Sequence, residues 1–312
     1  MDLDSGLLRA FVTVADEGHF GRAAERLVIS QQALSKRINR LESLLGVSLF
    51  DRTNRRVVIT ATGRRLLPLA RQAVDTSDAV ATEAARNAGP LRIDVLDNYL
   101  ASMLIARGVA QRGRLDVEAR TRTDHFDALD ALRTTDVDIA LGRAGSVVGP
   151  WPTDIRRRLV LLEPIRLLVG TDHPVAGRDA VPMAELADLH LWFPMTGAPR
   201  EWIELVDELC ADFGLVVDRA GSTLGFEYFV QRLADDPGLS TLFGGAMAPP
   251  GPALRVVPIV DPVPVFAWWA MSRRRVPDAR VQAVCDQAAQ LTGIPLADAH
   301  HVWMPAADRA RL

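Results

Sequence analysis

Apolar residues recur at helical spacing through the first 45 positions and predict three helices. The first covers residues 7–15 and ends at Gly18, and a short second helix covers residues 20–27. The third covers residues 31–45 and has Ser30 as its N-cap. Its apolar positions form one buried stripe, made of Leu34, Ile38, Leu41 and Leu45.

The residues after Gly46 predict a small β-wing. An apolar strand leads to Arg52, a basic turn follows at residues 54–56, and a second strand covers residues 57–59. Together with the three helices, this order is typical of a winged helix-turn-helix domain, for which we expect the bounds 1–60.

A fourth helical pattern begins at Thr60, extends to about Asn87 and stops before Gly89-Pro90. At ~1.5 Å per residue the helix would be roughly 40 Å long. Pro68 lies inside it and should kink it or loosen its first turns. A seam of apolar and small residues suits a coiled-coil-like contact between two copies, whereas the alternative is a helix packed on its own domain. The seam comprises Leu66, Leu67, Ala70, Ala73, Val74, Ser77, Val80, Ala81 and Ala84.

From residue 91 onward, short apolar strands alternate with helical stretches, which predicts a parallel α/β sheet in a third domain. The expected strands cover residues 91–96, 115–119, 137–141, 160–170, 215–219, 239–243, 255–260 and 263–272. The expected helices cover residues 99–111, 126–133, 183–186, 202–213, 226–233 and 280–291. Beyond Gly293 the sequence shows no clear pattern, and we expect a tail over 294–312 rather than a metal site at His300-His301.

Composition narrows the class of protein. A chain of 312 residues is too long for one core, and its 48% apolar and 24% charged residues are typical of a globular protein. Cys210 and Cys285 lie far apart without ligand-like neighbours, which argues against a disulfide framework or a zinc site. With no export signal and no long apolar stretch, we expect a cytoplasmic protein.

The net charge of −3 hides a local surplus of positive charge. Residues 20–65 carry ten Arg and Lys against three Asp and Glu, and Lys36 is the only lysine of the chain. Such a concentration is typical of polyanion binding, although a solvated basic face would give the same count.

The outward face of the third helix carries amides, hydroxyls and cations. Such groups pair with base edges and phosphates, and the N-terminal half of a recognition helix normally enters the major groove. The alternatives are an ordinary amphipathic surface helix and a wing tip of solvated arginines. The expected DNA contacts are Ser30, Gln31, Gln32, Ser35 and Lys36 at the start of the helix, Arg37 and Arg40 at the DNA backbone, and Arg52, Arg55 and Arg56 at a phosphate or in the minor groove.

Many positions at fixed spacing over about 60 residues resemble the start of a LysR-type transcriptional regulator. Two positions depart from that pattern: Gln32 stands where proline is common, and Thr62 replaces the usual alanine before Gly63. The matching residues are Phe11-Val12-Thr13-Val14-Ala15, Phe20, Ala23-Ala24-Glu25-Arg26-Leu27, Ser30-Gln31-Gln32-Ala33-Leu34-Ser35, Leu41-Glu42, Leu44-Leu45-Gly46, Leu49-Phe50 and Arg52-Thr53.

The resemblance implies more than the residues show by themselves. It implies a tetramer built from two dimers, and a sensor similar to periplasmic solute-binding domains, with two α/β lobes joined by crossing strands. Val137-Asp138-Ile139-Ala140 and His173-Pro174-Val175-Ala176 match landmarks of that sensor. The expected lobe I covers about 91–162 and 266–293, and lobe II covers about 163–265. The complete expected division is 1–60, a linker helix at 61–89, a sensor at 90–293 and a tail at 294–312.

Effectors of such a sensor are expected between the lobes, at the carboxyl ends of strands. Arg143 or Arg200 could hold a carboxylate as a fork donor. A carboxylate at Asp97 would disfavour an anion nearby, so the charge of the effector stays open. The expected effector contacts are Asp97, Asn98, Tyr99, Arg143, Thr196, Ser222, Thr223 and Phe243.

Three other functions compete with a regulator. An α/β enzyme is disfavoured because the sequence contains no phosphate loop, no His-Glu-x-x-His and no Gly-x-Ser-x-Gly. A solute-binding module would leave the first 65 residues without a role, and an architectural DNA-binding protein would sense nothing. We therefore expect a sequence-specific, effector-modulated DNA-binding regulator without cofactor or metal. Its expected partners are double-stranded DNA with an interrupted inverted repeat, a small-molecule effector, further copies of itself in a homodimer or homotetramer, and RNA polymerase.

Overall fold

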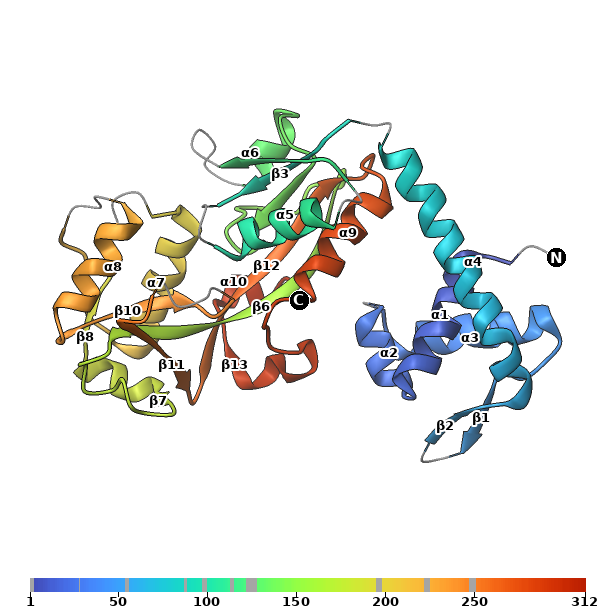
Figure 1. The fold of residues 1–312 in the computed structure, drawn as a ribbon, viewed down its shortest axis with the longest axis horizontal. Helices are drawn as coiled ribbons and strands as arrows, with labels where there is room; N and C mark the ends of the chain where they lie inside the picture. The colour runs from blue at the N-terminus through green and yellow to red at the C-terminus, as the bar shows by residue number, and fades with distance from the viewer. Residues whose placement is uncertain are drawn as a thin grey trace. The chain divides into compact units, whose positions relative to one another are not determined.

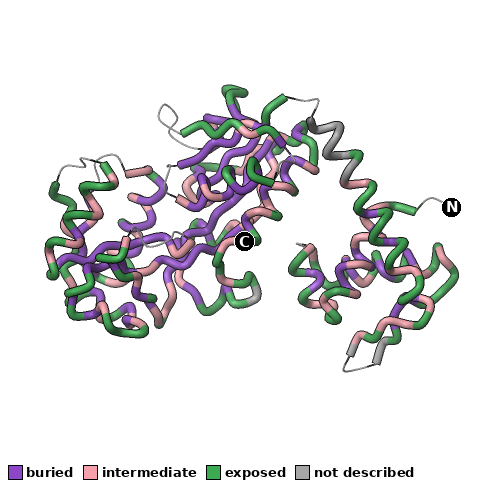
Figure 2. Tube along the Cα trace, viewed as in Figure 1, coloured by how far each residue is buried: buried purple, intermediate pink, exposed green. Residues whose placement is uncertain are grey.

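A computed structural model of the chain describes residues 3–27, 29–53, 56–86, 89–96, 100–112, 115–121, 128–194, 198–221, 225–246 and 251–312. The chain forms two compact units, Met1–Asn87 and Ala88–Leu312 (Figure 1). Each unit has its own buried core (Figure 2). None of the described helices is both long enough and apolar enough to cross a membrane.

The first unit confirms the predicted helix-turn-helix, wing and linker helix. Its elements are α1 (Ser5–Glu17), α2 (Phe20–Arg26), α3 (Gln31–Leu45), β1 (Phe50–Thr53), β2 (Arg56–Ile59) and α4 (Ala61–Arg86). β1 and β2 pair antiparallel, with Phe50 opposite Ile59 and Thr53 opposite Arg56.

Local capping fixes where the first three helices begin and end. The side chain of Asp4 accepts a hydrogen bond from the backbone N–H of Gly6 at the start of α1, and His19 does the same at α2. Ser30 Oγ accepts from the N–H of Ala33 at 3.1 Å, which confirms its predicted capping role and satisfies a donor that the helix leaves open. α3 ends at Gly46, whose φ of 68° is left-handed.

The core of the first unit joins the wing to the helices. The predicted stripe of α3 is buried at Leu34, Ile38 and Leu41, each with no exposed surface. The rings of Phe50 of β1 and Phe11 of α1 pack in a T-shaped arrangement, with 5.5 Å between their centroids. Leu45, the fourth predicted stripe residue, is half-buried against the same core.

The linker helix α4 uses much of its predicted seam within its own unit. Ala70 is buried in the core of the helix-turn-helix, and Leu66 and Leu67 pack against that core. Val74, one turn further along α4, is also buried. This part of the seam therefore packs on its own domain, as the alternative prediction had it, and is not available for a contact between two copies. α4 is helical from Ala61 to Arg86, and Pro68 does not interrupt it.

Two ion pairs fasten the linker helix to α1. Arg9 donates to both carboxylate oxygens of Asp78, at 3.1 and 2.5 Å. Arg71 of α4 donates to Asp16 of α1. Both pairs join α4 to the same helix and add to the apolar packing of α4 on the core.

The second unit contains the predicted strands and helices, together with short elements that the sequence did not indicate. Its elements are β3 (Leu91–Val95), α5 (Ala101–Gln111), β4 (Val117–Thr121), α6 (Ala128–Arg133), β5 (Ile139–Gly142), β6 (Ile155–Gly170), β7 (Val181–Pro182), η1 (Met183–Asp188), β8 (His190–Trp192), α7 (Arg200–Phe213), β9 (Val217–Asp218), α8 (Phe226–Asp235), β10 (Leu239–Gly244), β11 (Leu254–Val260), β12 (Val263–Arg273), α9 (Asp278–Ala288), η2 (Leu296–His301), β13 (Val302–Trp303) and α10 (Ala306–Arg309).

The sheet is mixed, which corrects the expectation of a parallel sheet. β3 is parallel to β4 and β5, and β8 is parallel to β9 and β10. β6 and β12, however, run antiparallel to each other. β12 is also antiparallel to β5, and β6 is antiparallel to β10 and β11.

β6 belongs to both lobes. Its first part, Ile155–Pro164, pairs with β12 in lobe I, and residues 165–170 pair with β10 and β11 in lobe II. This long shared strand, with β12 beside it, forms the crossing connection that the resemblance implied (Figure 1).

The expected tail is folded. β13 pairs parallel with β12, with Val302 opposite Val263, and η2 and α10 flank it. Met304 and Asp308 are buried, so residues 296–309 belong to the second unit. These elements are two to six residues long, too short for a hydrophobic period to show in the sequence.

Candidate DNA-binding surface and effector site

The outward face of α3 is open to solvent. Gln31, Gln32, Lys36, Arg37 and Arg40 are all exposed. Ser35, on the same helix, is half-buried. These predicted base-contacting and backbone-contacting side chains of α3 thus lie outside its buried stripe.

The cations of α3 differ from those of α2 in their partners. Within the described residues, no carboxylate lies within ion-pair distance of Lys36, Arg37 or Arg40. On α2, by contrast, Arg26 donates to Glu17 at 2.9 Å. Cations without a carboxylate neighbour remain available for phosphates and base edges. The electrostatics therefore favour α3 over α2 as the polyanion-binding helix.

Glu42, one of the residues that match the family pattern, has a supporting role that the sequence did not predict. Its Oε1 accepts hydrogen bonds from the backbone N–H groups of Leu49, at 2.7 Å, and Phe50, at 3.3 Å. The carboxylate therefore fixes the first wing strand against the end of α3. A glutamate one position after the buried Leu41 was the available signal.

The tip of the wing is only partly described. Arg52 and Arg56 lie on β1 and β2 near the turn, but their side chains lie outside the described structure, as does Arg55 as a whole. The expected contacts of these three arginines with DNA stay predictions.

Thr60 and Gly63 join the wing to the linker helix. Thr60 Oγ1 donates to the carbonyl of Ser48 at 2.8 Å and accepts from the N–H of Gly63 at 2.9 Å, so Thr60 caps α4. A Cβ at position 63 would lie 2.4 Å from the carbonyl oxygen of Leu49. The backbones at Gly63 and Leu49 therefore meet at a distance that only glycine permits. Thr62, which departs from the usual alanine, lies at a half-buried position.

Most expected effector contacts lie outside the described residues: Asp97, Asn98, Tyr99, Thr196, Ser222 and Thr223. Phe243 is described, and it is a core residue of lobe II, buried with Trp192 and Leu233. Its ring therefore supports the lobe from inside. Arg200 is exposed and donates to Glu204 at 2.6 Å.

Arg143 is buried and already bound by its own chain, which removes the basis for expecting it to hold an effector carboxylate. Its Nε donates to Asp308 at 2.6 Å, Nη1 to the carbonyl of Glu201 at 3.1 Å and Nη2 to Glu208 at 3.1 Å. Burial lowers the pKa of Arg143, but Asp308 and Glu208 outweigh burial and hold that pKa above its usual value. Every guanidinium nitrogen thus has a partner within the protein.

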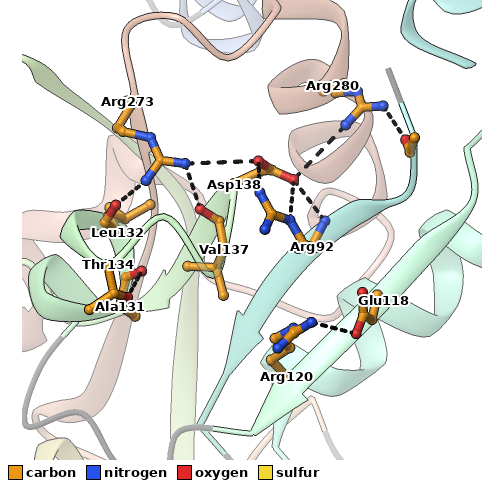
Figure 3. Close-up of polar contacts among 11 residues, drawn as sticks. Arg92, Glu118, Arg120, Ala131, Leu132, Thr134, Val137, Asp138, Arg273 and Arg280 are labelled. Carbon is orange, nitrogen blue, oxygen red and sulfur yellow. Dashed lines mark hydrogen bonds and ion pairs between the residues drawn. The ribbon is translucent and has the colours of Figure 1, made fainter. Parts of the chain in front are cut away.

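A second charge cluster, which is only partly buried, surrounds Asp138 directly before β5 (Figure 3). Asp138 accepts from the backbone N–H and from Nη2 of Arg92, both at 3.0 Å. Arg273 and Arg280 lie 3.9 and 4.0 Å from the same carboxylate. Burial raises the pKa of Asp138, but the Arg92 hydrogen bonds and the nearby arginines outweigh burial and hold the pKa below its ordinary value.

The Asp138 cluster also holds the point where the chain enters the second unit. Arg280 Nη2 donates to the carbonyl of Gly89 at 2.5 Å, two residues before β3. Asp138 belongs to the residues 137–140 that resemble the sensor of the family. Its three arginine partners lie far from it in the sequence, so no local spacing predicted them. Among the described residues, no group of His, Cys, Asp or Glu is arranged to hold a metal ion.

Two family profiles match the chain. The profile described as "Bacterial regulatory helix-turn-helix protein, lysR family" matches residues 6–64, and the profile "LysR substrate binding domain" matches residues 84–292. The second profile alone covers more than half of the chain, and together the two profiles match parts of both compact units.

Individual proteins are similar over shorter or longer stretches. "HTH-type transcriptional regulator ShiR" of Corynebacterium glutamicum is 36% identical over 217 residues, which are 67% of this chain and 72% of ShiR. "Uncharacterized HTH-type transcriptional regulator YnfL" of Escherichia coli is 34% identical over 194 residues, which are 60% of this chain. That match spans 64% of YnfL, just under two thirds of its length. Full-length BenM has the same fold, with a TM-score of 0.52, 21% identity, and coverage of 97% of this chain and 100% of BenM.

Proposed function

The chain belongs to the LysR family of transcriptional regulators, and from this premise we propose that it reads an interrupted inverted repeat in DNA and responds to a small molecule bound between its sensor lobes. The exposed face of α3 carries the proposal, because it combines amides with cations that have no carboxylate partner in the described structure. A regulator also uses both units, whereas the enzyme alternative leaves the helix-turn-helix without a role.

The test of DNA reading compares Lys36→Ala with Arg133→Ala. Both variants lose one exposed cation, but Arg133 lies on α6 of the second unit. Sites would first be selected from genomic DNA, and affinity then measured by fluorescence anisotropy. Lys36→Ala should weaken binding to the selected site by ~1–3 kcal/mol and relax its sequence preference. Equal affinities and preferences in both variants would remove Lys36 from the set of base contacts.

We propose that two copies pair through the outer side of α4. Leu69 and Val80 are 61% and 66% exposed, and Ala73 and Thr76 between them are also exposed. These four positions are spaced by four, three and four residues, as in a coiled-coil seam. In a dimer, two linked helix-turn-helix domains bind two DNA half-sites with a high effective concentration. Because the two domains are related by symmetry, the expected target is an inverted repeat. We extend the proposal to a tetramer of two dimers that contacts RNA polymerase at promoters in the cytoplasm.

The effector is proposed to bind where the strands of the two lobes end, at residues 97–99, 196 and 222–223. A compound that binds only the native state raises the melting temperature by mass action. A thermal-shift screen of the full chain against small metabolites of both charges tests this idea. A compound that stabilises the chain and changes its DNA affinity supports the regulator, whereas stabilisation by none of them favours an architectural DNA-binding protein.

A further inference from the structure

The C-terminal segment, residues 294–312, contacts both lobes of the sensor. On the lobe I side it adds β13 to the sheet beside β12, and Ala299, Val302 and Met304 are buried in the core of that lobe. This side of the contact is apolar and built from packed side chains.

On the lobe II side, the segment contacts α7 through Trp303. The indole N–H of Trp303 donates to Asp212 Oδ2 at 2.8 Å. Its ring packs against Phe213 in a T-shaped arrangement, with 5.8 Å between centroids. Both partners are the last residues of α7, so one side chain of the segment ties down the end of that helix.

Asp308 extends the same connection to a buried guanidinium. Its side chain has no exposed surface, and its two oxygens accept from Arg143 Nε at 2.6 Å and from the N–H of Gly145 at 2.8 Å. Arg143 in turn donates to Glu201 and Glu208 of α7. One chain of contacts thus runs from the segment through lobe I into lobe II.

We propose that the C-terminal segment is an intramolecular ligand of the sensor, whose Asp308 carboxylate fills an anion position on Arg143 and holds the two lobes in one arrangement. Arg143 directly follows β5, and the carboxyl ends of strands are where α/β sheets bind ligands. A guanidinium and a backbone N–H together recognise a carboxylate, and a tethered carboxylate has a high effective concentration there. The chain supplies for itself the group that an external anion would bring.

Chemical rescue tests whether the Arg143 position binds a carboxylate. In the full chain, Asp308→Ala removes the carboxylate and leaves the guanidinium. Sodium acetate, compared with sodium chloride at equal ionic strength and pH, should raise the melting temperature of this variant by at least about 2 °C and leave the unaltered chain unchanged. Asp298→Ala, an exposed aspartate of the same segment, is the matched control and should not respond. Equal acetate responses in all three proteins would overturn the proposal.

Hydrogen exchange tests whether the segment restrains lobe II, and it serves also if Asp308→Ala does not fold. Asp308→Asn keeps the shape of the side chain, and Trp303→Phe keeps the ring but loses the bond to Asp212. Both should speed exchange in α7 while β3 exchanges as before. Unchanged hydrogen exchange in α7 in both variants would show that the C-terminal segment does not restrain lobe II. Neither readout involves DNA or an effector, so either result leaves the proposed regulator function to be judged separately.

Discussion

The indole N–H of Trp268 donates to Oε2 of Glu163 at 2.6 Å, and this bond joins the two strands that cross between the lobes. Both side chains are fully buried, and the other carboxylate oxygen accepts from the N–H of Ala246 at 3.0 Å. Burial raises the pKa of Glu163, and the hydrogen bonds from Trp268 and Ala246 counteract part of that rise. The stability of the crossing strands β6 and β12 therefore depends on the two hydrogen bonds that Trp268 and Ala246 donate to this buried acid.

Trp268→Phe should therefore destabilise the sensor by more than the loss of ring volume. The variant leaves a buried carboxylate oxygen without its donor, which costs ~1–3 kcal/mol in addition to the cavity. Trp202→Phe is the matched control, because Trp202 is also buried but its indole N–H has no acceptor in the described structure. Urea unfolding of both variants measures the difference, and equal losses would contradict a stabilising role for the Glu163 bond.

Asp138 should make the stability of the second unit depend on acid pH. Its folded-state pKa lies below the ordinary value, so the cluster stabilises the fold above about pH 4. That stabilisation is lost as the pH falls through the folded-state pKa, because protonation removes the charge facing Arg92, Arg273 and Arg280. Asp138→Asn should lower stability at pH 6 and flatten the acid limb of the unfolding free energy.

The control for Asp138 is Asp188→Asn, an exposed aspartate of the same unit. Chemical denaturation at several pH values between 3 and 6 compares the slopes of the two variants with the unaltered chain. A slope for Asp138→Asn that matches the unaltered chain would contradict the expected linkage.

Gly63→Ala should weaken the junction of wing and linker helix. The new methyl group would lie 2.4 Å from the Leu49 carbonyl, and overpacking against backbone costs ~1–3 kcal/mol. Gly177→Ala is the control, because a Cβ there has nothing within 4 Å. Differential scanning calorimetry should show a lower transition for the first unit only in Gly63→Ala, and no shift would mean that the backbones separate at little cost.

Leu69→Glu and Val80→Glu should dissociate the proposed dimer. Each substitution places a charge on the exposed apolar side of α4, where two such charges would face each other across a helix pair. Val148→Glu introduces the same charge at a valine that is 88% exposed in the second unit. Sedimentation velocity at micromolar concentration distinguishes the variants, and an unchanged mass for both α4 variants would exclude this side of the helix as the interface.

Arg40→Ala should lower DNA affinity by a similar factor for all sequences. An arginine at the DNA backbone releases about one counterion, so the slope of log affinity against log salt should fall by ~0.9. The selected site and a scrambled duplex would be titrated at several salt concentrations. A loss confined to the selected site would instead make Arg40 a base contact.

Periodicity predicted the first unit well because its helices carry long, regular apolar stripes. Leu34, Ile38 and Leu41 alone define the inner side of α3, and with it the outer side that faces DNA in the proposal. The apolar periodicity of α4 predicted a contact between two copies on the side that packs on its own domain. An apolar stripe shows that one side of a helix is buried, but it does not show which part of the protein buries it. Here Ala70 and Val74 are covered by the chain itself.

The candidate sensor contacts were harder to foresee, since they depend on residues far apart in the sequence. Arg143 and Asp308 are separated by 165 positions, and no local pattern links them. Asp308 lies in a helix of four residues that follows a strand of two, below the length at which hydrophobic periods become visible. Strand direction was also invisible, because a fully buried strand such as β12 shows no alternation in either orientation.

Lys36 is the only lysine of the chain and stands exposed on the outer side of α3. A reagent that acylates primary amines therefore has one side chain to modify, together with the α-amino group at the N-terminus. If bound DNA shields that amine, the extent of acylation at a single peptide reports how much of the protein is on DNA. The regulator thus carries a natural one-site footprinting probe, read by mass spectrometry without any engineered label.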